Sequence, residues 1–226
     1  MSIEQNLTQI KKQICKFLQK CNRSDQVTLL AVTKTKPVND IEQAIACGQR
    51  AFGENYVQEG VEKIAYFHNY NDLEWHFIGT LQSKKTRLVA AYFDWVQTID
   101  RLKVATRLNE QRPEHLAPLN VLIQINISDE ESKSGIAPRE MLSLANEIML
   151  LPRLKLRGLM AIPKSESEPE KQKIALNKMK ALFDTLQQHY PEIDTLSMGM
   201  SNDMQSAIEC GSTMVRIGSA IFGARS

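Results

Sequence analysis

The chain has 226 residues, of which 42% are hydrophobic and 24% charged, enough apolar sequence for the core of one sizeable α/β domain. Its 28 Lys and Arg residues against 26 Asp and Glu give a formal net charge of +2, and the two signs are mixed, so no nucleic-acid partner is indicated. No stretch approaches the ~20 apolar residues of a membrane-spanning helix, and the first residues lack a signal-peptide pattern, so we expect a cytoplasmic protein.

Elements alternate along the chain after an N-terminal amphipathic helix over residues 2–21. An apolar, β-branched run over 27–33 predicts a buried strand, and Pro37 begins a helix that ends at Gly48. Further strands are predicted at 50–54, 75–78, 93–97, 119–125, 154–160, 195–198 and 214–217. Further helices are predicted from 57 to about 64 and at 82–91, 100–111, 138–150, 170–189 and 203–210.

Eight strand signals, the first seven each followed by a helical one, indicate parallel strands joined by crossover helices. In a chain of this length the pattern favours a single closed (β/α)8 TIM barrel over 1–226, with the first helix as an addition. An open doubly wound sheet is the alternative. Polar segments at 126–137 and 163–170 are expected to be loops over the C-terminal ends of the strands.

Four cysteines and four histidines are scattered without metal-binding spacing. The chain has neither a C-x-x-C pair nor an H-E-x-x-H motif. We therefore expect free, mostly buried thiols rather than a metal site or disulfide bonds.

Lys34 follows the first predicted strand and precedes a break at Pro37. In a barrel this places an amine at the mouth, where partial burial favours the neutral form that condenses with an aldehyde. The alternative is that Lys34 only marks where a strand meets solvent. Lys36, two residues further on, is a competitor, although Pro37 argues against a strand that continues to it.

The C-terminal strand ends of a barrel form its active face, and a polar set collects there. These residues are Lys34, Glu54, Asn55, Tyr56, Gly79, Asn126, Gly199, Met200, Ser201, Arg216, Gly218 and Ser219. Strands one and eight are neighbours in a closed barrel, so Lys34 and Arg216 are expected to lie near each other.

Two glycine turns follow strands seven and eight, at Gly199 and at Gly218-Ser219. Paired turns of this kind recur as phosphate cradles in barrels, although helix caps and tight turns also need glycine. Ser201 or Asn202 is expected to cap the next helix.

Arg216 lies within the last strand segment, where arginine is rarely buried unpaired. It either faces a ligand or forms a salt bridge with Glu54 or Asp203. A lysine for an aldehyde, a phosphate cradle and an arginine between them describe a site for pyridoxal 5′-phosphate (PLP).

Successive motifs at 31–37, 52–59, 76–79, 196–204, 211–218 and 220–225 resemble those of the pyridoxal phosphate homeostasis protein family over essentially the whole chain. The resemblance implies a barrel like the alanine racemase N-terminal domain, without that enzyme's second β-domain. Lys34 would form the internal aldimine with PLP, and Arg216 would face the pyridine nitrogen. The remaining residues implied at the cofactor are Ser201, Gly218 and Ser219 at the phosphate, and Asn55 and the segment from His76 to Ile78 along the flank.

Three positions depart from the family pattern. Thr33 replaces the usual serine before the lysine, and Thr80 and Lys84 replace a proline and an asparagine after strand three. Thr33 keeps the hydroxyl, so the departure there does not affect the assignment of Lys34.

An arginine beside the ring nitrogen favours a carrier over an enzyme. It cannot take up a proton at physiological pH, so the nitrogen stays unprotonated and the ring is a weak electron sink. A racemase also needs a second acid/base, which alanine racemase is expected to take from its second domain. We therefore expect a monomer that binds PLP and stores or delivers it, with apo PLP-dependent enzymes as partners. A weak amino-acid racemase or other PLP enzyme, and a Schiff-base aldolase, are the alternatives.

Overall fold

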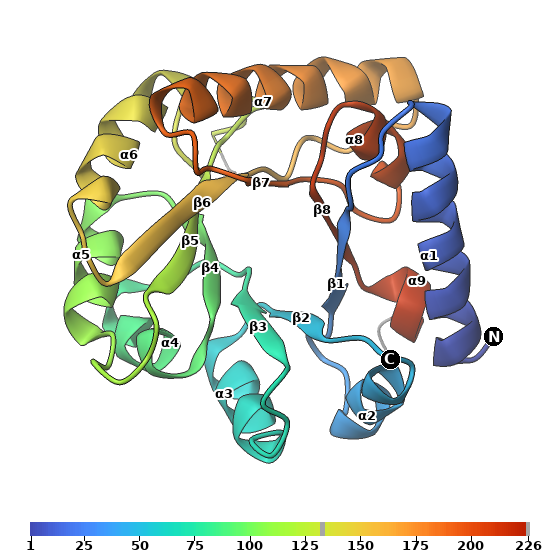
Figure 1. Ribbon diagram of the computed structural model, residues 1–226, viewed down its shortest axis with the longest axis horizontal. Helices are drawn as coiled ribbons and strands as arrows, with labels where there is room; N and C mark the ends of the chain where they lie inside the picture. The colour runs from blue at the N-terminus through green and yellow to red at the C-terminus, as the bar shows by residue number, and fades with distance from the viewer. Residues whose placement is uncertain (132–133, 225–226) are drawn as a thin grey trace.

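Eight parallel strands close into a barrel in chain order in the computed structural model, which describes residues 1–131 and 134–224 (Figure 1). The strands are β1 (Thr28–Val32), β2 (Ala51–Glu54), β3 (Glu74–Phe77), β4 (Trp95–Ile99), β5 (Leu119–Gln124), β6 (Leu154–Met160), β7 (Thr195–Ser197) and β8 (Met214–Ile217). β1 pairs with both β2 and β8, so the open doubly wound alternative is wrong and the closed barrel is confirmed. Each predicted strand is present, with its ends displaced by at most two residues.

Helices surround the barrel, and one follows each of the first seven strands (Figure 1). They are α2 (Val38–Ala46), α3 (Val57–Tyr66), α4 (Thr86–Tyr92), α5 (Leu102–Gln111), α6 (Met141–Met149), α7 (Pro169–His189) and α8 (Met204–Glu209). Short 3-10 turns at Ser83–Lys85 and Pro138–Glu140 precede α4 and α6. Lys84, one of the family departures, lies in the first of these turns. A further helix, α9 (Ser219–Phe222), was not predicted, because four residues are too few for a periodic pattern.

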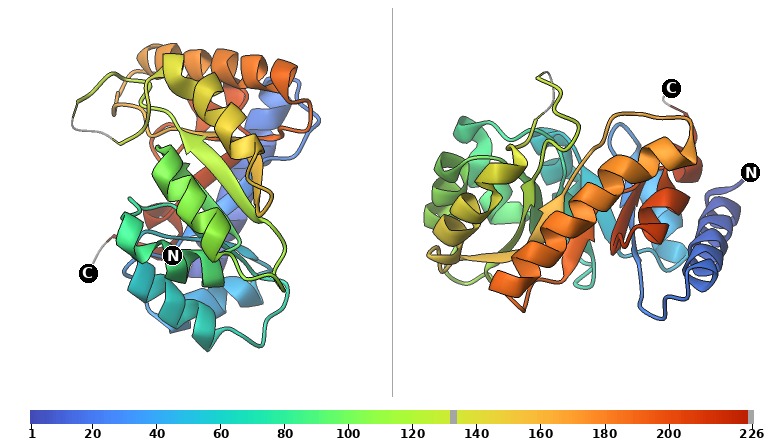
Figure 2. Two further views of the ribbon diagram at one scale, coloured as in Figure 1. Left: turned by 90° about the vertical axis from the view of Figure 1, so that its left-hand side faces the viewer. Right: turned by 90° about the horizontal axis from the view of Figure 1, so that it is seen from above.

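The N-terminal helix α1 (Ile3–Lys20) lies beside α8 and α9 at one edge of the molecule (Figure 2). A capping box begins it, because Ser2 Oγ accepts from the backbone N–H of Gln5 while the Gln5 side chain accepts from the N–H of Ser2. Its buried face is apolar, and Asn6 Nδ2 donates to the carbonyl oxygen of Ile221 in α9 at 2.8 Å. The helix therefore fastens the segment that follows β8.

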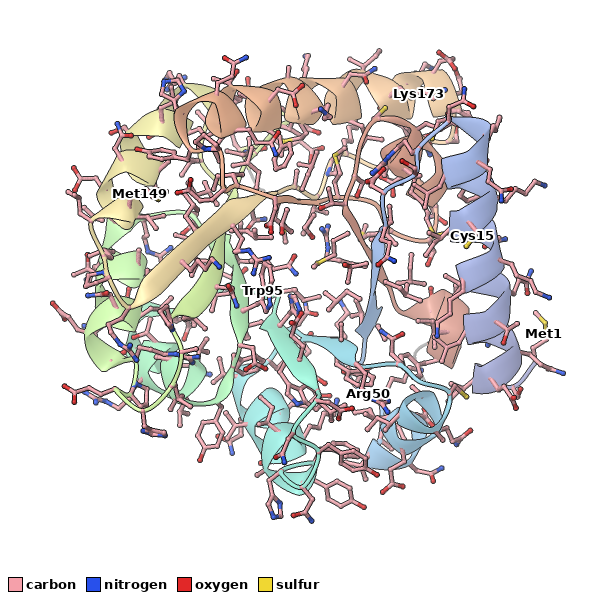
Figure 3. All side chains as sticks on the ribbon, viewed as in Figure 1. Met1, Cys15, Arg50, Trp95, Met149 and Lys173 are labelled. Atoms are coloured by element: carbon pink, nitrogen blue, oxygen red, sulfur yellow. The ribbon has the colours of Figure 1, made fainter. Side chains whose placement is uncertain are left out.

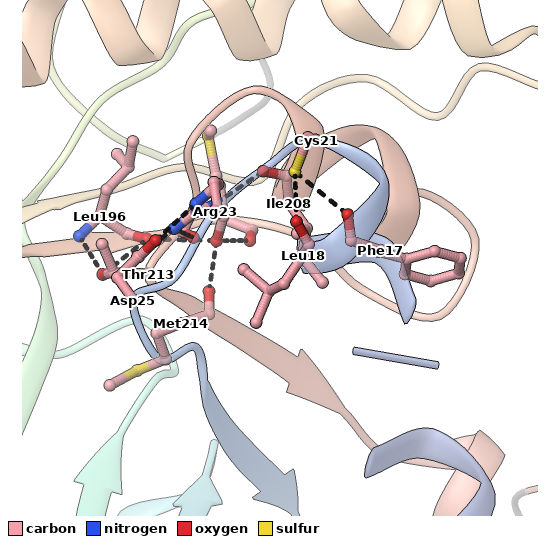
Figure 4. Close-up of polar contacts among 11 residues, drawn as sticks. Phe17, Leu18, Cys21, Arg23, Asp25, Leu196, Ile208, Thr213 and Met214 are labelled. Atoms are coloured by element: carbon pink, nitrogen blue, oxygen red, sulfur yellow. Dashed lines mark hydrogen bonds and ion pairs between the residues drawn. The ribbon is translucent and has the colours of Figure 1, made fainter. Parts of the chain in front are cut away.

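The segment leading into β8 is fixed by Arg23, which lies between α1 and β1 (Figure 4). Its guanidinium donates to the carbonyl oxygens of Ile208 at 2.6 Å and Ser212 at 3.0 Å, and pairs with Asp25. Thr213 Oγ1 accepts from the backbone N–H of Leu196 at 2.8 Å, which joins the starts of β7 and β8. These contacts place β8, and with it Arg216, relative to its neighbours.

The apolar core has two parts. The main cluster lies between the strands and the helices and includes Leu29 and Ala31 of β1, whereas Leu30 between them points into the barrel. Two smaller clusters fill the interior: Leu30 with Ile78 and Met214, and Trp95 with Leu122 and Met160. Figure 3 shows Trp95 inside the ring of strands, where side chains occupy the space that the ribbon leaves open. The barrel is thus packed rather than hollow.

The four cysteines are free, as expected, but only Cys210 is fully buried and Cys15 is exposed. Among residues 1–131 and 134–224, no group of three or more His, Cys, Asp or Glu side chains is arranged to hold a metal ion. Across the same residues, no helix combines the length and apolarity needed to cross a lipid bilayer. Of the predicted loop at 126–137 and the motif at 220–225, residues 132–133 and 225 lie outside the described residues.

Candidate functional site

A cavity of about 400 Å³ opens at the C-terminal ends of the strands. Its wall is made by residues that follow β1, β2, β6, β7 and β8, over an apolar floor of Val32, Ile78 and Met160. Six of the seven predicted cofactor-binding residues line it: Lys34, Asn55, Ser201, Arg216, Gly218 and Ser219. The loop predicted over the strand ends contributes its residues 163–166. The topology thus brings together residues that are up to 185 positions apart in sequence, from Lys34 to Ser219.

His76, the seventh predicted residue, does not line this cavity. It is fully buried inside the barrel, where its ring stacks on Trp95 at a centroid separation of 4.8 Å and an interplanar angle of 14°. Glu74 and Gln97 are its hydrogen-bond partners. Five other residues of the predicted strand-end set are also outside the lining: Glu54, Tyr56, Gly79, Asn126 and Gly199. Gly79 packs on Asn55, and Asn126 donates to the carbonyl oxygen of Glu130.

Lys34 lies in a turn that begins directly after the last backbone hydrogen bond between β1 and β2. The N–H of Thr33 donates to the carbonyl oxygen of Gly53 at 2.9 Å, and Lys34 then leaves the sheet, half-buried, at the cavity wall. Thr35 has φ of 62°, a left-handed conformation that disfavours a β-branched residue by about 1–2 kcal/mol. Its N–H donates to Glu59 Oε1 at 2.6 Å, a charge-assisted bond that offsets this strain.

A buried ionic cluster supports that turn from below. Lys63 Nζ, on α3, donates to the carbonyl oxygen of Thr33 at 2.6 Å and to Glu54 Oε1 and Glu59 Oε1, each at 2.7 Å. Thr33 Oγ1 also donates to Glu54 Oε1 at 2.6 Å. Burial raises the pKa of the Glu54 carboxyl, and the adjacent Lys63 opposes that shift. Thr33 keeps the hydroxyl of the family's usual serine. This hydroxyl stabilises the turn through Glu54 and does not line the cavity.

Asn55 presents an unsatisfied acceptor at the cavity wall. Its Oδ1 is buried and has no hydrogen-bond partner among the described residues. An added Cβ at Gly79 would lie 2.0 Å from the Asn55 carbonyl oxygen, so only glycine allows the end of β3 to pack so closely. A buried acceptor left unpaired costs about 1–3 kcal/mol, which a ligand with a suitably placed donor would recover.

The two glycine turns are built differently. Gly199 has φ of 104°, and a Cβ there would lie 2.7 Å from Ala207 Cβ, so both its conformation and its surroundings require glycine. Its carbonyl oxygen accepts from the N–H of Arg216 at 2.9 Å, which ties the end of β7 to β8. Gly218 instead brings the end of β8 against β1, where a Cβ would lie 3.3 Å from Val32 Cβ.

The predicted cap of α8 is wrong. The helix begins at Met204, so Asp203 rather than Ser201 or Asn202 occupies the N-cap position, and no side chain there makes a capping hydrogen bond. Asp203 Oδ1 accepts from the N–H of Met200 instead, at 2.7 Å, and so closes the turn. Ser201 and Asn202 remain exposed in the cavity lining.

Arg216 faces the cavity although only 4% of it is exposed. Its guanidinium donates to Ser197 Oγ at 2.7 Å and to the carbonyl oxygen of Ala161 at 2.9 Å. Neither predicted partner forms a salt bridge with it in the described chain, because Glu54 is bound to Lys63 and Asp203 acts only at longer range. Burial lowers the pKa of Arg216 to about 10, opposed by Asp203, so the side chain is still a cation at neutral pH.

The sequence analysis did not identify four residues that support the site. Glu59 and Lys63 bind the turn at Lys34, and Ser197 and Gln97 continue the hydrogen bonds of Arg216. The i,i+4 spacing of Glu59 and Lys63 was visible, but such a pair on a helix normally lies on the solvated face. Gln97 and Ser197 point into the barrel by strand alternation, which could have identified them.

The family profile for "Alanine racemase, N-terminal domain" matches residues 5–226. A protein of Pasteurella multocida named pyridoxal phosphate homeostasis protein is 64% identical over 229 residues, covering 100% of this chain and 98% of its own length. The protein of the same name from Escherichia coli is 60% identical, covering 99% of this chain and 97% of its own.

Solved structures agree with this relationship. PipY of Synechococcus elongatus, determined with PLP bound, is 31% identical with a TM-score of 0.85, over 98% of this chain and 100% of its own. An alanine racemase from Clostridium difficile is 16% identical with a TM-score of 0.72, over 94% of this chain and 56% of its own, and that likeness concerns the fold alone.

Proposed function

The chain belongs to the pyridoxal phosphate homeostasis proteins, which share the alanine racemase N-terminal domain, and on that premise we propose that it binds PLP in the cavity at the strand ends. We further propose that it holds the cofactor for storage or delivery rather than for turnover. The observation that carries this proposal is that one cavity is lined by Lys34, by the buried cation Arg216 and by residues of both glycine turns, namely 200–203 after Gly199, and Gly218 with Ser219.

The residues present fit the cofactor's groups. PLP supplies an aldehyde that condenses with a neutral amine and a ring that withdraws electrons when its nitrogen is protonated. Lys34 is the amine at the wall, and Ser201, Gly218 and Ser219 offer hydroxyl and backbone donors to the phosphate. The unpaired Asn55 Oδ1 accepts a donor such as the ring hydroxyl, and the apolar floor suits the ring face.

Arg216 determines what such a site does chemically. With a pKa of about 10 it stays protonated at neutral pH, so it would donate a hydrogen bond to a ring nitrogen. Unlike a carboxylate, it has no acceptor that could stabilise a proton on that nitrogen. An unprotonated ring is a weak electron sink. The geometry therefore supports retention of PLP better than carbanion chemistry at an amino acid.

Delivery requires that the cofactor can leave, and the cavity mouth is open to solvent. Ile162 and Met200 at the mouth are 38% and 42% exposed. We propose that the chain acts as one domain, as a cytoplasmic monomer, and hands PLP to apo PLP-dependent enzymes.

Two measurements test the function. Purified protein mixed with PLP should develop the absorption of lysine-bound cofactor, and it should then activate an apo-enzyme faster than an equal concentration of free PLP does. A protein that stays colourless would overturn the binding proposal. Turnover of alanine or serine enantiomers by the pure protein would favour the racemase alternative, and aldol cleavage would favour the aldolase.

A further inference from the structure

A continuous chain of hydrogen bonds crosses the barrel interior from the cavity to the opposite end. Arg216 Nη1 donates to Ser197 Oγ at 2.7 Å, and Ser197 Oγ donates to Gln97 Oε1 at 2.6 Å. Gln97 Nε2 lies 2.9 Å from His76 Nδ1, and His76 Nε2 lies 2.7 Å from Glu74 Oε1. The chain thus links β8, β7, β4 and β3.

The direction of donation in this chain follows from its cationic end. Arg216 has only donors, so Ser197 Oγ must accept from it and must give its own proton to Gln97 Oε1. The amide of Gln97 then presents its NH₂ to His76 Nδ1, which must carry a lone pair. His76 is therefore the neutral tautomer with its proton on Nε2, donating to Glu74.

Burial and nearby charges keep these hydrogen bonds in this direction and His76 in its neutral form. Ser197, Gln97 and His76 are each 0% exposed, so none of them can exchange its partner for bulk water. Burial lowers the pKa of His76, opposed by Glu74 and Asp94, while Arg157 adds to the lowering. Arg157 also lies 4.6 Å from the centroid of Trp95, the ring on which His76 stacks.

We propose that His76 is a positioning residue for the cofactor, acting on Arg216 through Gln97 and Ser197 without touching the ligand, a proposal that rests on the PLP-binding function proposed above. The lone pair on His76 Nδ1 fixes the orientation of the Gln97 amide. In that orientation Gln97 Oε1 accepts the hydroxyl proton of Ser197, so a lone pair of Ser197 Oγ stays available to accept from Arg216. The guanidinium is then held at the side of the cavity where the ring nitrogen is expected.

Paired substitutions at His76 separate its two hydrogen bonds. His76→Asn places an amide oxygen near Nδ1 and keeps an acceptor for Gln97. His76→Gln reaches toward Glu74 and leaves Gln97 Nε2 only the weak acceptor Met214 Sδ, at 3.2 Å, among the described residues. Because one hydrogen bond contributes a net ~0.5–1.5 kcal/mol, His76→Gln should weaken PLP binding about two- to twelvefold. His76→Asn should recover most of that affinity. Equal affinity of wild type and His76→Gln would overturn the proposal.

A double-mutant cycle tests whether the effect passes through Arg216. PLP is titrated by absorbance into wild type, His76→Gln, Arg216→Gln and the double variant, with thermal unfolding recorded for each. In the Arg216→Gln background, His76→Gln should cause no further loss of affinity. An undiminished loss there would show that His76 acts independently of Arg216, and would contradict the proposal.

Two outcomes keep this test separate from the proposed function. Failure of wild type to bind PLP would remove the function itself, whereas normal wild-type binding with no coupling would remove only the role of His76. If the His76 variants show no cooperative unfolding, Ser197→Ala cuts the same chain one link closer to Arg216. Its loss of affinity must likewise vanish in the Arg216→Gln background.

Discussion

Lys63 Nζ donates to the carbonyl oxygen of Thr33 at 2.6 Å, one residue before the lysine proposed to hold the cofactor. The same ammonium neutralises Glu54 and Glu59, so it anchors the turn that carries Lys34 from α3. The turn that carries the proposed cofactor lysine is thus supported by a second, buried lysine, whose ammonium donates to three acceptors.

Removing that ammonium should be strongly destabilising. Lys63→Met keeps the aliphatic length but leaves Glu54 buried without its cation, and breaking such a pair costs about 3–5 kcal/mol. Denaturant unfolding of the protein without PLP measures the loss. Lys171→Met removes an exposed pair with Glu168 and should change stability by less than about 1 kcal/mol. Similar small effects for both variants would contradict the role given to Lys63.

Replacing Asn55 is expected to weaken PLP binding without lowering the stability of the PLP-free protein. Its Oδ1 is buried and has no hydrogen-bond partner within residues 1–131 and 134–224. Asn55→Ala should therefore leave the unfolding free energy of the PLP-free protein unchanged or raise it by about 1 kcal/mol. The same change should weaken PLP binding, because the acceptor at the wall is lost. Unfolding curves with and without PLP measure both effects. A variant that is destabilised yet binds PLP normally would show that Asn55 has only a structural role.

The contribution of Glu74 to the free energy of unfolding is expected to depend on pH in the acid range. The hydrogen bond from His76 is the main cause that lowers the pKa of Glu74 below its ordinary value of 4.5, against desolvation. A carboxyl whose folded pKa is depressed adds stability above the unfolded pKa and loses it as pH falls through the folded value. The stability advantage of wild type over Glu74→Gln should therefore shrink as pH falls from about 5 toward 3. A constant difference over this range would contradict the assignment.

Arg216→Gln tests the cation at the cavity. The variant keeps a hydrogen-bond donor but loses the buried charge, so the affinity for PLP should fall about tenfold or more, the range of a charge-assisted bond. The exposed pair of Arg50 with Asp72 offers a matched control, and Arg50→Gln should bind PLP as wild type does. Equal binding by both variants would exclude Arg216 from the site.

Much of this architecture was predictable from the sequence, since the periodic apolar pattern predicted all eight strands and their order. Strand ends then placed six of the seven predicted cofactor-binding residues in one cavity, because parallel strands have their C-terminal ends at one face. The cap of α8 was misplaced because Asp203 bonds backward to Met200, a choice that depends on the turn geometry rather than on residue type.

The sequence motif did not predict the position of His76 correctly relative to the cavity. Its place in the sequence pattern predicted a residue at the cofactor, yet strand alternation and the barrel's depth put its ring below the cavity floor. Strand alternation could have placed Gln97 and Ser197 inside the barrel, but it could not predict their hydrogen bonds. Arg216 and Ser197 are 19 positions apart in sequence, Ser197 and Gln97 are 100 apart, and they meet only inside the closed barrel. Lys63 was missed because its burial depends on how α3 packs over β2.

The most direct test of the account is to identify the lysine that holds PLP. Lys36 also lines the cavity, with its Nζ bonded to the carbonyl oxygen of Ala224 at 2.9 Å, and it is therefore the matched control. The protein is loaded with PLP and reduced with borohydride, and the modified peptide is then mapped in wild type, Lys34→Ala and Lys36→Ala. We expect modification at Lys34 in wild type and in Lys36→Ala, and its loss in Lys34→Ala. Modification that persists in Lys34→Ala, or that falls on Lys36 in wild type, would contradict the assignment of Lys34.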